Sequence, residues 1–186
     1  ICSGLVGSEM CIRDSSQGAS FFDENITELI IEISKKRNFE VIQQISNNNN
    51  LSSTKNKYDK SNINYKFIEF TNDSHELYNG IDLAITRGGA STLSELSFLN
   101  IPFISIPLPS ARDNHQFYNS EFYYKKNCCW LINQKEFEFK KFSKMIFEIL
   151  NDYKNYNEKF KNLEEITKKN TWNNINNKII EIIDEN

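Results

Sequence analysis

Two spacings of apolar residues alternate along this chain. Short apolar runs are typical of buried strands, whereas apolar residues that recur every three or four positions are typical of helices. The runs predict strands at residues 39–45, 65–70, 81–85, 103–106 and 129–132. The helical spacing predicts helices at residues 25–37, 74–79, 91–99, 115–125, 138–150, 153–168 and 171–183. Strands that alternate with helices indicate βαβ units, so we expect an α/β fold with a Rossmann-like parallel sheet flanked by helices.

Two segments differ from this alternation. Residues 47–62 are polar and contain four consecutive Asn residues, which predicts a surface loop. Residues 1–15 lack the basic start and long apolar centre of a signal peptide, and they also lack the Asn, Lys and Ile bias that follows. Because they resemble translated sequencing-adapter read-through, we interpret them as a non-native leader on a fragment cut at its N-terminus. Residues 16–170 are expected to form one domain.

The composition narrows the possible functions. With 22 basic and 25 acidic residues in 186, the formal net charge is −3, which gives no support for general nucleic-acid binding. The four cysteines form no Cys-x-x-Cys pair, so neither a zinc site nor a disulfide framework is expected, as suits a reducing cytoplasm. No apolar stretch approaches the roughly 20 residues that a membrane-spanning helix needs.

The turn after the predicted strand 81–85 is the candidate ligand site. Gly88 and Gly89 have no Cβ atom, so the backbone can turn sharply there and a ligand can approach closely. The helix that starts near Ala90 presents unpaired N–H groups and the positive end of its dipole to this turn. Such a helix end suits a phosphate or pyrophosphate group.

Glu95 gives this helix a second candidate role. It lies one helical turn beyond Ser91 and Thr92, so the three side chains share a face and the carboxylate could accept hydrogen bonds from ribose hydroxyls. The same residues also fit another pattern, because Thr92-x-x-Glu95 is a capping box that many helices carry without any ligand. Spacing alone leaves both interpretations open.

The predicted topology brings two loops together. In parallel α/β sheets, ligands bind beyond the carboxyl ends of the strands. The glycine turn follows strand 81–85, and the polar loop 113–116 follows strand 103–106. Both loops should therefore open on the same edge of the sheet, and this convergence is the physical argument for a site.

Three motifs resemble those of a known family. Residues 16–19 (SQGA) resemble the end of a Gly-Gly-Ser-Gln-Gly-Ala loop, and residues 86–95 (TRGGASTLSE) resemble a uridine- and phosphate-binding turn and helix. Residues 107–119, which contain PLP and DNHQFYN, resemble a sugar-contacting loop. The family is that of the MurG-type N-acetylglucosaminyltransferases, glycosyltransferase family 28. The similarity covers about residues 16–170 and implies the C-terminal, donor-binding half of a GT-B glycosyltransferase.

The resemblance implies a set of donor-binding residues. Carried over position by position, they are Ser16, Thr71, Gly89, Ala90, Ser91, Thr92, Leu93, Ser94, Glu95 and Gln116. Ser16 would contact a donor phosphate, and Thr71 would lie by the uracil through its backbone. The N–H groups of residues 90–92 and the Thr92 hydroxyl would bind the pyrophosphate. Glu95 would hold the ribose, and Gln116 would bind hydroxyls of the GlcNAc.

The resemblance also implies an activity. Enzymes of this family transfer GlcNAc from UDP-GlcNAc, with inversion, to undecaprenyl-pyrophosphoryl-MurNAc-pentapeptide (lipid I), which makes lipid II for peptidoglycan synthesis. They work in the cytoplasm, peripherally on the inner face of the bacterial plasma membrane. No cofactor is implied. Because the chain has no Asp-x-Asp pair for a divalent metal, helix N–H groups would stabilise the departing UDP instead.

The acceptor site, the membrane-facing patch and the general base of this family belong to its N-terminal domain, which lies outside residues 16–170. We therefore expect this chain alone to bind the donor weakly or not at all and to catalyse nothing, with lipid I and the membrane contacted mainly through that domain. Residues 171–186 carry an apolar stripe at spacings of three and four. This helix either packs on its own domain or crosses to the N-terminal one.

Several positions depart from the family pattern. Asp14 and Ser15 stand where the family has glycines, and a native carboxylate at Asp14 would weaken donor binding by lying beside the phosphates. Ser91 stands where the family usually has an apolar residue, and His115 where a second Gln is common. We expect His115 to orient the sugar loop, and neither it nor His75 to act as the base.

Other function classes stay open. One is a stand-alone UDP-GlcNAc-binding subunit that pairs with a separate acceptor-binding membrane subunit. Another is a different UDP-GlcNAc enzyme of GT-B fold, such as an epimerase, which would need extra carboxylates in the sugar cleft. A non-enzymatic nucleotide-binding module is a further alternative. Titration with UDP, UDP-GlcNAc and ADP separates a uridine site from a generic anion site.

Overall fold

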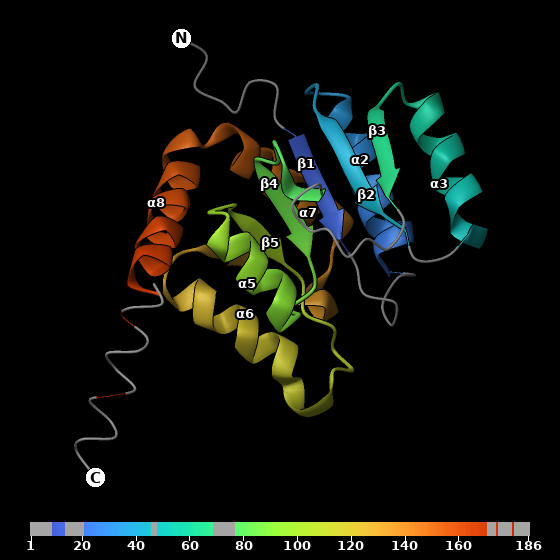
Figure 1. Ribbon diagram of the computed structural model, residues 1–186. Helices are drawn as coiled ribbons and strands as arrows, with labels where there is room; N and C mark the ends of the chain where they lie inside the picture. Colours follow the sequence, from blue (N-terminus) through green and yellow to red (C-terminus); the bar gives the residue numbers. More distant parts are fainter. Residues whose placement is uncertain are drawn as a thin grey trace.

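A parallel sheet with helices on both faces makes up the computed structural model, which describes residues 9–13, 21–45, 48–68 and 77–170, together with 174 and 180. Within these residues the strands are β1 (Glu9–Arg13), β2 (Glu40–Gln44), β3 (Asn64–Ile68), β4 (Leu83–Thr86), β5 (Phe103–Ser105) and β6 (Cys129–Leu131). All neighbouring strands pair in parallel, in the order β3-β2-β1-β4-β5-β6 (Figure 1). The expected α/β fold with a Rossmann-like parallel sheet is confirmed.

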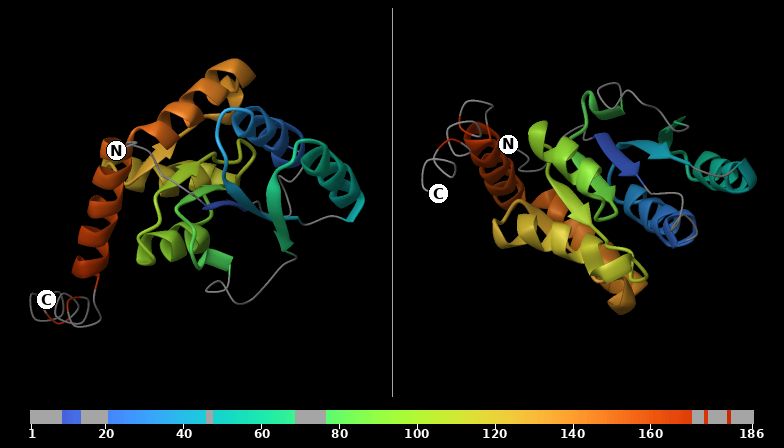
Figure 2. Two further views of the ribbon diagram at one scale, coloured as in Figure 1. Left: turned by 90° about the horizontal axis from the view of Figure 1, so that it is seen from above. Right: turned by 60° about the horizontal axis from the view of Figure 1, so that its bottom comes forward.

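Helices cover the two faces of this sheet. They are α2 (Thr27–Ser34), α3 (Asn48–Lys60), α5 (Ala90–Phe98), α6 (His115–Lys125), α7 (Phe139–Asn151) and α8 (Tyr153–Lys169), with shorter helical turns η1 (Phe22–Ile26), η2 (Arg112–Asn114) and η3 (Gln134–Glu136). Figure 1 shows α5 and α6 over the near face, with α2 and α7 over the far face. The two further views in Figure 2 show the same layers from above and from below.

Each face of the sheet has its own hydrophobic core, because side chains alternate between the faces of a strand. Met10 and Ile12 of β1 pack with residues of α2, α3 and α7, whereas Cys11 between them packs with residues of α5 and α8. The central strands are buried on both faces, which explains why they read as short continuous apolar runs in the sequence. The segments that follow β4 and β5 meet beyond the carboxyl ends of these strands, where Gly88 packs on the backbone of Gln116.

Most predicted elements are confirmed, with ends that shift by one to a few residues. The helix predicted at 115–125 coincides with α6. The helix predicted at 25–37 is divided, because its first turn is the π-helical η1 and only then does α2 begin. Of the helix predicted at 74–79, only its end is described, where Gly80 adopts a left-handed conformation with φ of 84°. The helix predicted at 171–183 lies outside the described residues apart from 174 and 180.

The prediction of a surface loop at residues 47–62 is wrong, because the chain forms helix α3 there. Two parallel strands need a crossover connection, and α3 makes the crossover between β2 and β3. Its buried side chains, Thr54 and Tyr58, are spaced one helical turn apart, and the Tyr58 hydroxyl donates a hydrogen bond to Gln43 Oε1 at 2.6 Å. Tertiary packing of this narrow stripe therefore outweighs the polar composition that favoured a loop.

Strand β1 comes from the segment that the sequence led us to interpret as a leader. It lies between β2 and β4, and its Met10, Cys11 and Ile12 are at most 1% exposed. The five residues Glu9–Arg13 therefore complete the centre of the sheet in this polypeptide. Their packing does not test their origin, so the interpretation of residues 1–15 as non-native stays a prediction.

Within the described residues, none of the helices combines the length and apolar character that crossing a membrane requires.

We expect Tyr58→Phe to lower the free energy of unfolding by about 1–3 kcal/mol, because it leaves the amide oxygen of a buried Gln43 without this donor. Tyr65→Phe is the matched control, since the Tyr65 hydroxyl donates at 2.7 Å to Asp59 in an exposed position. Urea unfolding of both variants is the measurement. Equal losses in the two variants would contradict the role of α3 as a packed helix.

Candidate functional site

The start of helix α5 is open. Gly89 precedes it in an extended conformation, with φ of −69° and ψ of 130°, and no side chain caps the helix within the described chain. The first four N–H groups of an α-helix have no partner inside the helix, so this end can offer them to a ligand. Ala90 and Ser91 are exposed and Thr92 is half-buried, which leaves this turn accessible.

The capping-box interpretation of Thr92 and Glu95 is not supported by this geometry. A capping box requires Thr at the N-cap, but the N-cap is Gly89, three residues earlier. The carboxylate of Glu95 instead makes an ion pair with Arg13 of strand β1. Within the part of the chain that the structure describes, the helix start therefore keeps its N–H groups free of side-chain caps, as an anion site requires.

Gly88 and Gly89 have different structural roles. A Cβ atom at Gly88 would lie 2.1 Å from the backbone oxygen of Gln116 and 2.6 Å from Ser120 Oγ, so the turn can pass α6 only without a side chain. At Gly89 the nearest atom to such a Cβ would be Thr92 Oγ1, at 4.0 Å. The first glycine is therefore required for packing, and the second leaves space beside the helix start.

Gln116 connects α6 to the loop that follows β5. It is 8% exposed, and its Oε1 accepts a hydrogen bond from the backbone N–H of Leu108 at 3.0 Å. Among the described residues its Nε2 group has no partner, and so it remains a donor for a ligand oxygen. The predicted sugar-binding side chain thus has one end fixed by the protein and the other end unused.

A hollow of about 290 Å³ lies beside this loop. Its lining consists of Pro107, Leu108, Pro109, Asn114, Phe117, Tyr118, Asn133 and Lys135. These residues come from the loops after β5 and β6 and from α6, and none belongs to α5. Asp113 and Asn114, with φ of 52° each, turn the chain into α6, and His115 Nδ1 lies 2.7 Å from the Arg112 carbonyl oxygen. His115 thus contacts its own loop, and its role in orienting that loop stays a prediction.

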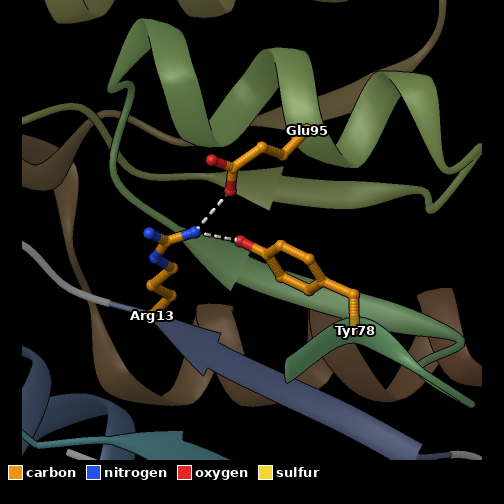
Figure 3. A network of polar contacts seen from close by, with 3 residues as sticks. All are labelled: Arg13, Tyr78 and Glu95. Carbon is orange, nitrogen blue, oxygen red and sulfur yellow. Dashed lines mark hydrogen bonds and ion pairs between the residues drawn. The ribbon is translucent and has the colours of Figure 1, made fainter. Parts of the chain in front are cut away.

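Glu95 is joined to Arg13 and Tyr78 in one polar network (Figure 3). Arg13 donates to Glu95 Oε2 at 2.7 Å and to the Tyr78 hydroxyl at 2.5 Å. Both charged side chains are partly exposed, at 17% and 32%, so solvent still reaches the pair. Burial raises the pKa of Tyr78 to about 12, and its hydroxyl is therefore neutral at physiological pH. The predicted ribose-binding carboxylate is thus occupied by a guanidinium of β1.

Arg87 adds a positive charge directly before the glycine turn. It is 2% exposed, donates to the Ile106 carbonyl at 3.1 Å and to Gln134 Oε1, and lies with its guanidinium 4.5 Å from the centroid of the Phe22 ring. Sequence analysis gave it no role. These contacts tie the residue before the glycine turn to the loop after β5 and to η3.

The other predicted site residues are placed as follows. Leu93 is buried in the core beneath α5, so only its backbone faces the helix start, whereas Ser94 is exposed. Ser16 and Thr71 lie outside the described residues, as does His75. Over the described ranges, no group of three or more His, Cys, Asp or Glu side chains could hold a metal ion.

Residues 15–176 match the family model of the glycosyltransferase family 28 C-terminal domain. Two curated relatives share the name UDP-N-acetylglucosamine--N-acetylmuramyl-(pentapeptide) pyrophosphoryl-undecaprenol N-acetylglucosamine transferase. The one from Pelagibacter ubique is 42% identical over 177 residues, which are 95% of this chain and 49% of the relative. The one from Rickettsia bellii is 37% identical over 155 residues, which are 82% of this chain and 43% of the relative. The chain spans about half the length of these relatives.

Solved structures share the fold. The crystal structure of Acinetobacter baumannii MurG has a TM-score of 0.74 at 20% identity, covering 85% of this chain and 47% of that one. The glycosyltransferase VinC, solved in complex with DTDP, has a TM-score of 0.66 at 11% identity, covering 87% of this chain and 37% of that one. Both similarities indicate that this chain has the fold of one half of a GT-B glycosyltransferase.

We expect Gly88→Ala to destabilise the fold by at least about 1–3 kcal/mol, the usual cost of overpacking, because the new methyl group would overlap α6 backbone. Gly89→Ala is the matched control and should unfold close to the wild type, since space is available there. Thermal unfolding of the two variants measures the difference. Equal stability of the two variants would contradict the close packing of the turn on α6.

Proposed function

The chain belongs to glycosyltransferase family 28, and we propose that it is the donor-binding half of an enzyme that transfers GlcNAc from UDP-GlcNAc to lipid I. The observation that carries the proposal is the uncapped start of α5 on the glycine turn, with a carboxylate one helical turn along the same helix. The acceptor site and the general base belong to a second domain. This chain alone therefore catalyses no transfer. The open start of α5 narrows the expectation of weak or absent donor binding to binding that is weak but measurable.

The diphosphate of the donor lies against the start of α5. N–H groups of residues 90–92 and the Thr92 hydroxyl donate to its oxygens, and Ser16 contacts one phosphate. When the bond to GlcNAc breaks, negative charge develops on the leaving UDP, and fixed N–H donors with the helix dipole stabilise it. No metal ion or other cofactor is part of the proposal.

Recognition of the nucleoside and of the sugar comes from the two ends of the site. Glu95 accepts hydrogen bonds from the ribose hydroxyls, and Thr71 meets the uracil through its backbone. Gln116 donates from its unused amide nitrogen to a GlcNAc hydroxyl, while its oxygen stays on Leu108 N–H. Gly89, Leu93 and Ser94 contribute backbone surface around the phosphates. The enzyme acts on the inner face of the plasma membrane, where lipid I is presented through the second domain.

UDP should bind more tightly than ADP. The two ligands share a diphosphate and a ribose, so the difference in affinity comes from the proposed contact of the Thr71 backbone with the uracil. Glu95→Gln should weaken UDP binding about tenfold, equivalent to about 1.4 kcal/mol, since the ribose loses a charged acceptor. Glu148→Gln is the control, because Glu148 pairs only loosely with Lys144, at 3.7 Å on α7. Ligand-observed NMR titration measures all three proteins. Equal binding of UDP and ADP would indicate a generic anion site.

Arg13→Leu should tighten UDP binding several-fold, because the guanidinium no longer competes with the ribose for Glu95. Inorganic pyrophosphate is the control ligand, since it has no ribose, and its affinity should not rise. The same NMR titration gives both values. An unchanged or weaker affinity for UDP would show that Glu95 is not the ribose acceptor or that Arg13 contacts the phosphates.

A further inference from the structure

The peptide between Gly88 and Gly89 is held by a side chain of α6. Asn119 Nδ2 donates to the Gly88 carbonyl oxygen at 3.0 Å; Gly88 is buried and Asn119 is half-buried. The motif that contains Asn119 suggested a contact with sugar. The structure separates the members of this motif, because Gln116 binds the loop after β5 whereas Asn119 binds the glycine turn.

The direction of the Gly88 carbonyl fixes the direction of the next N–H group. A peptide unit is planar, and in its trans form the C=O and N–H bonds point in opposite directions. Since the Gly88 carbonyl points to α6, the Gly89 N–H points away from α6. Within the described chain, this N–H has no backbone acceptor, and Gly89 is partly exposed. It is therefore available to a ligand beside the N–H groups of residues 90–92.

We propose that Asn119 is a positioning residue for the diphosphate: its bond to Gly88 holds the Gly89 N–H toward the phosphate oxygens. This inference rests on the proposed function, because it assumes a diphosphate at the start of α5. Donors that are fixed in advance need no reorganisation when the charge develops, so the bond contributes to binding without any contact between Asn119 and the ligand.

The packing of α6 does not depend on this bond. Ser120 Oγ donates to the Gln116 carbonyl at 2.8 Å and lies 2.7 Å from Ser105 Oγ of β5. Gln116 is bonded to Leu108, and the Gly88 backbone packs directly on α6. A variant that lacks the Asn119 amide should therefore keep the fold while the Gly88–Gly89 peptide gains freedom to rotate.

The test compares Asn119→Leu with Asn162→Leu in the full chain. Asn162 is a matched control, because its Nδ2 also donates to a backbone carbonyl at 3.0 Å, that of Asn127, but it lies on α8. The probes are UDP, inorganic pyrophosphate and uridine, titrated into ¹⁵N-labelled protein. Because the chain has only six glycines, the amide resonance of Gly89 can be assigned readily, and its shift reports ligand binding at this N–H group directly.

Asn119→Leu should weaken UDP and pyrophosphate about tenfold, leave uridine unchanged and remove the shift of the Gly89 amide on ligand addition. Asn162→Leu should behave as the wild type. Thermal unfolding checks the fold, and Asn119→Ala replaces the leucine variant if that variant does not fold. UDP binding by the wild type with no loss in the variant, or an equal loss for uridine and pyrophosphate, overturns this inference alone. No UDP binding by the wild type overturns the proposed function and this inference together.

Discussion

The contact between the Gly88 backbone and helix α6 sets the geometry of the candidate site. It brings the end of β4 so close to α6 that a single methyl group would overlap the Gln116 backbone. The turn passes there without a side chain and leads into α5, whose start no side chain caps within the described residues. The same close approach lets Asn119 reach the turn and lets Gln116 reach the next loop. This packing constraint therefore sets the positions of the groups that we propose as donors to the phosphates and to the sugar.

Elements that are stabilised by their own apolar residues can be predicted from the sequence, whereas elements that depend on packing against distant parts of the chain cannot. Buried parallel strands are apolar on both faces, so β4, β5 and β6 can be recognised from short runs. Helix α6 is predicted with its observed ends. Helix α3 is missed because, among its side chains described by the structure, those that are buried are Thr54 and Tyr58, and most of the others are polar. Its formation depends on the crossover between β2 and β3, which no local pattern shows.

The same distinction applies to the candidate site: its local features were predicted from the sequence, and its long-range contacts were not. The glycine turn and the open helix start follow from local spacing, and the structure decides against the capping box by placing the N-cap at Gly89. The pairing of Glu95 with Arg13 joins residues 82 positions apart, and it involves a segment interpreted as a leader. The position of Asn119 on the turn likewise depends on how α6 packs. Partners that lie far apart in the sequence cannot be identified from the spacing of residues. In a structure, a carbonyl held by a side chain beside a pair of glycines is the feature that reveals such a partner.

Determining a crystal structure of this chain with bound UDP-GlcNAc would test the central claim most directly. The account predicts diphosphate oxygens within hydrogen-bond distance of the N–H groups of residues 89–92, with the ribose hydroxyls on Glu95 and Arg13 displaced from it. A donor bound elsewhere on the sheet edge, or a diphosphate at α5 with the ribose away from Glu95, would contradict the account.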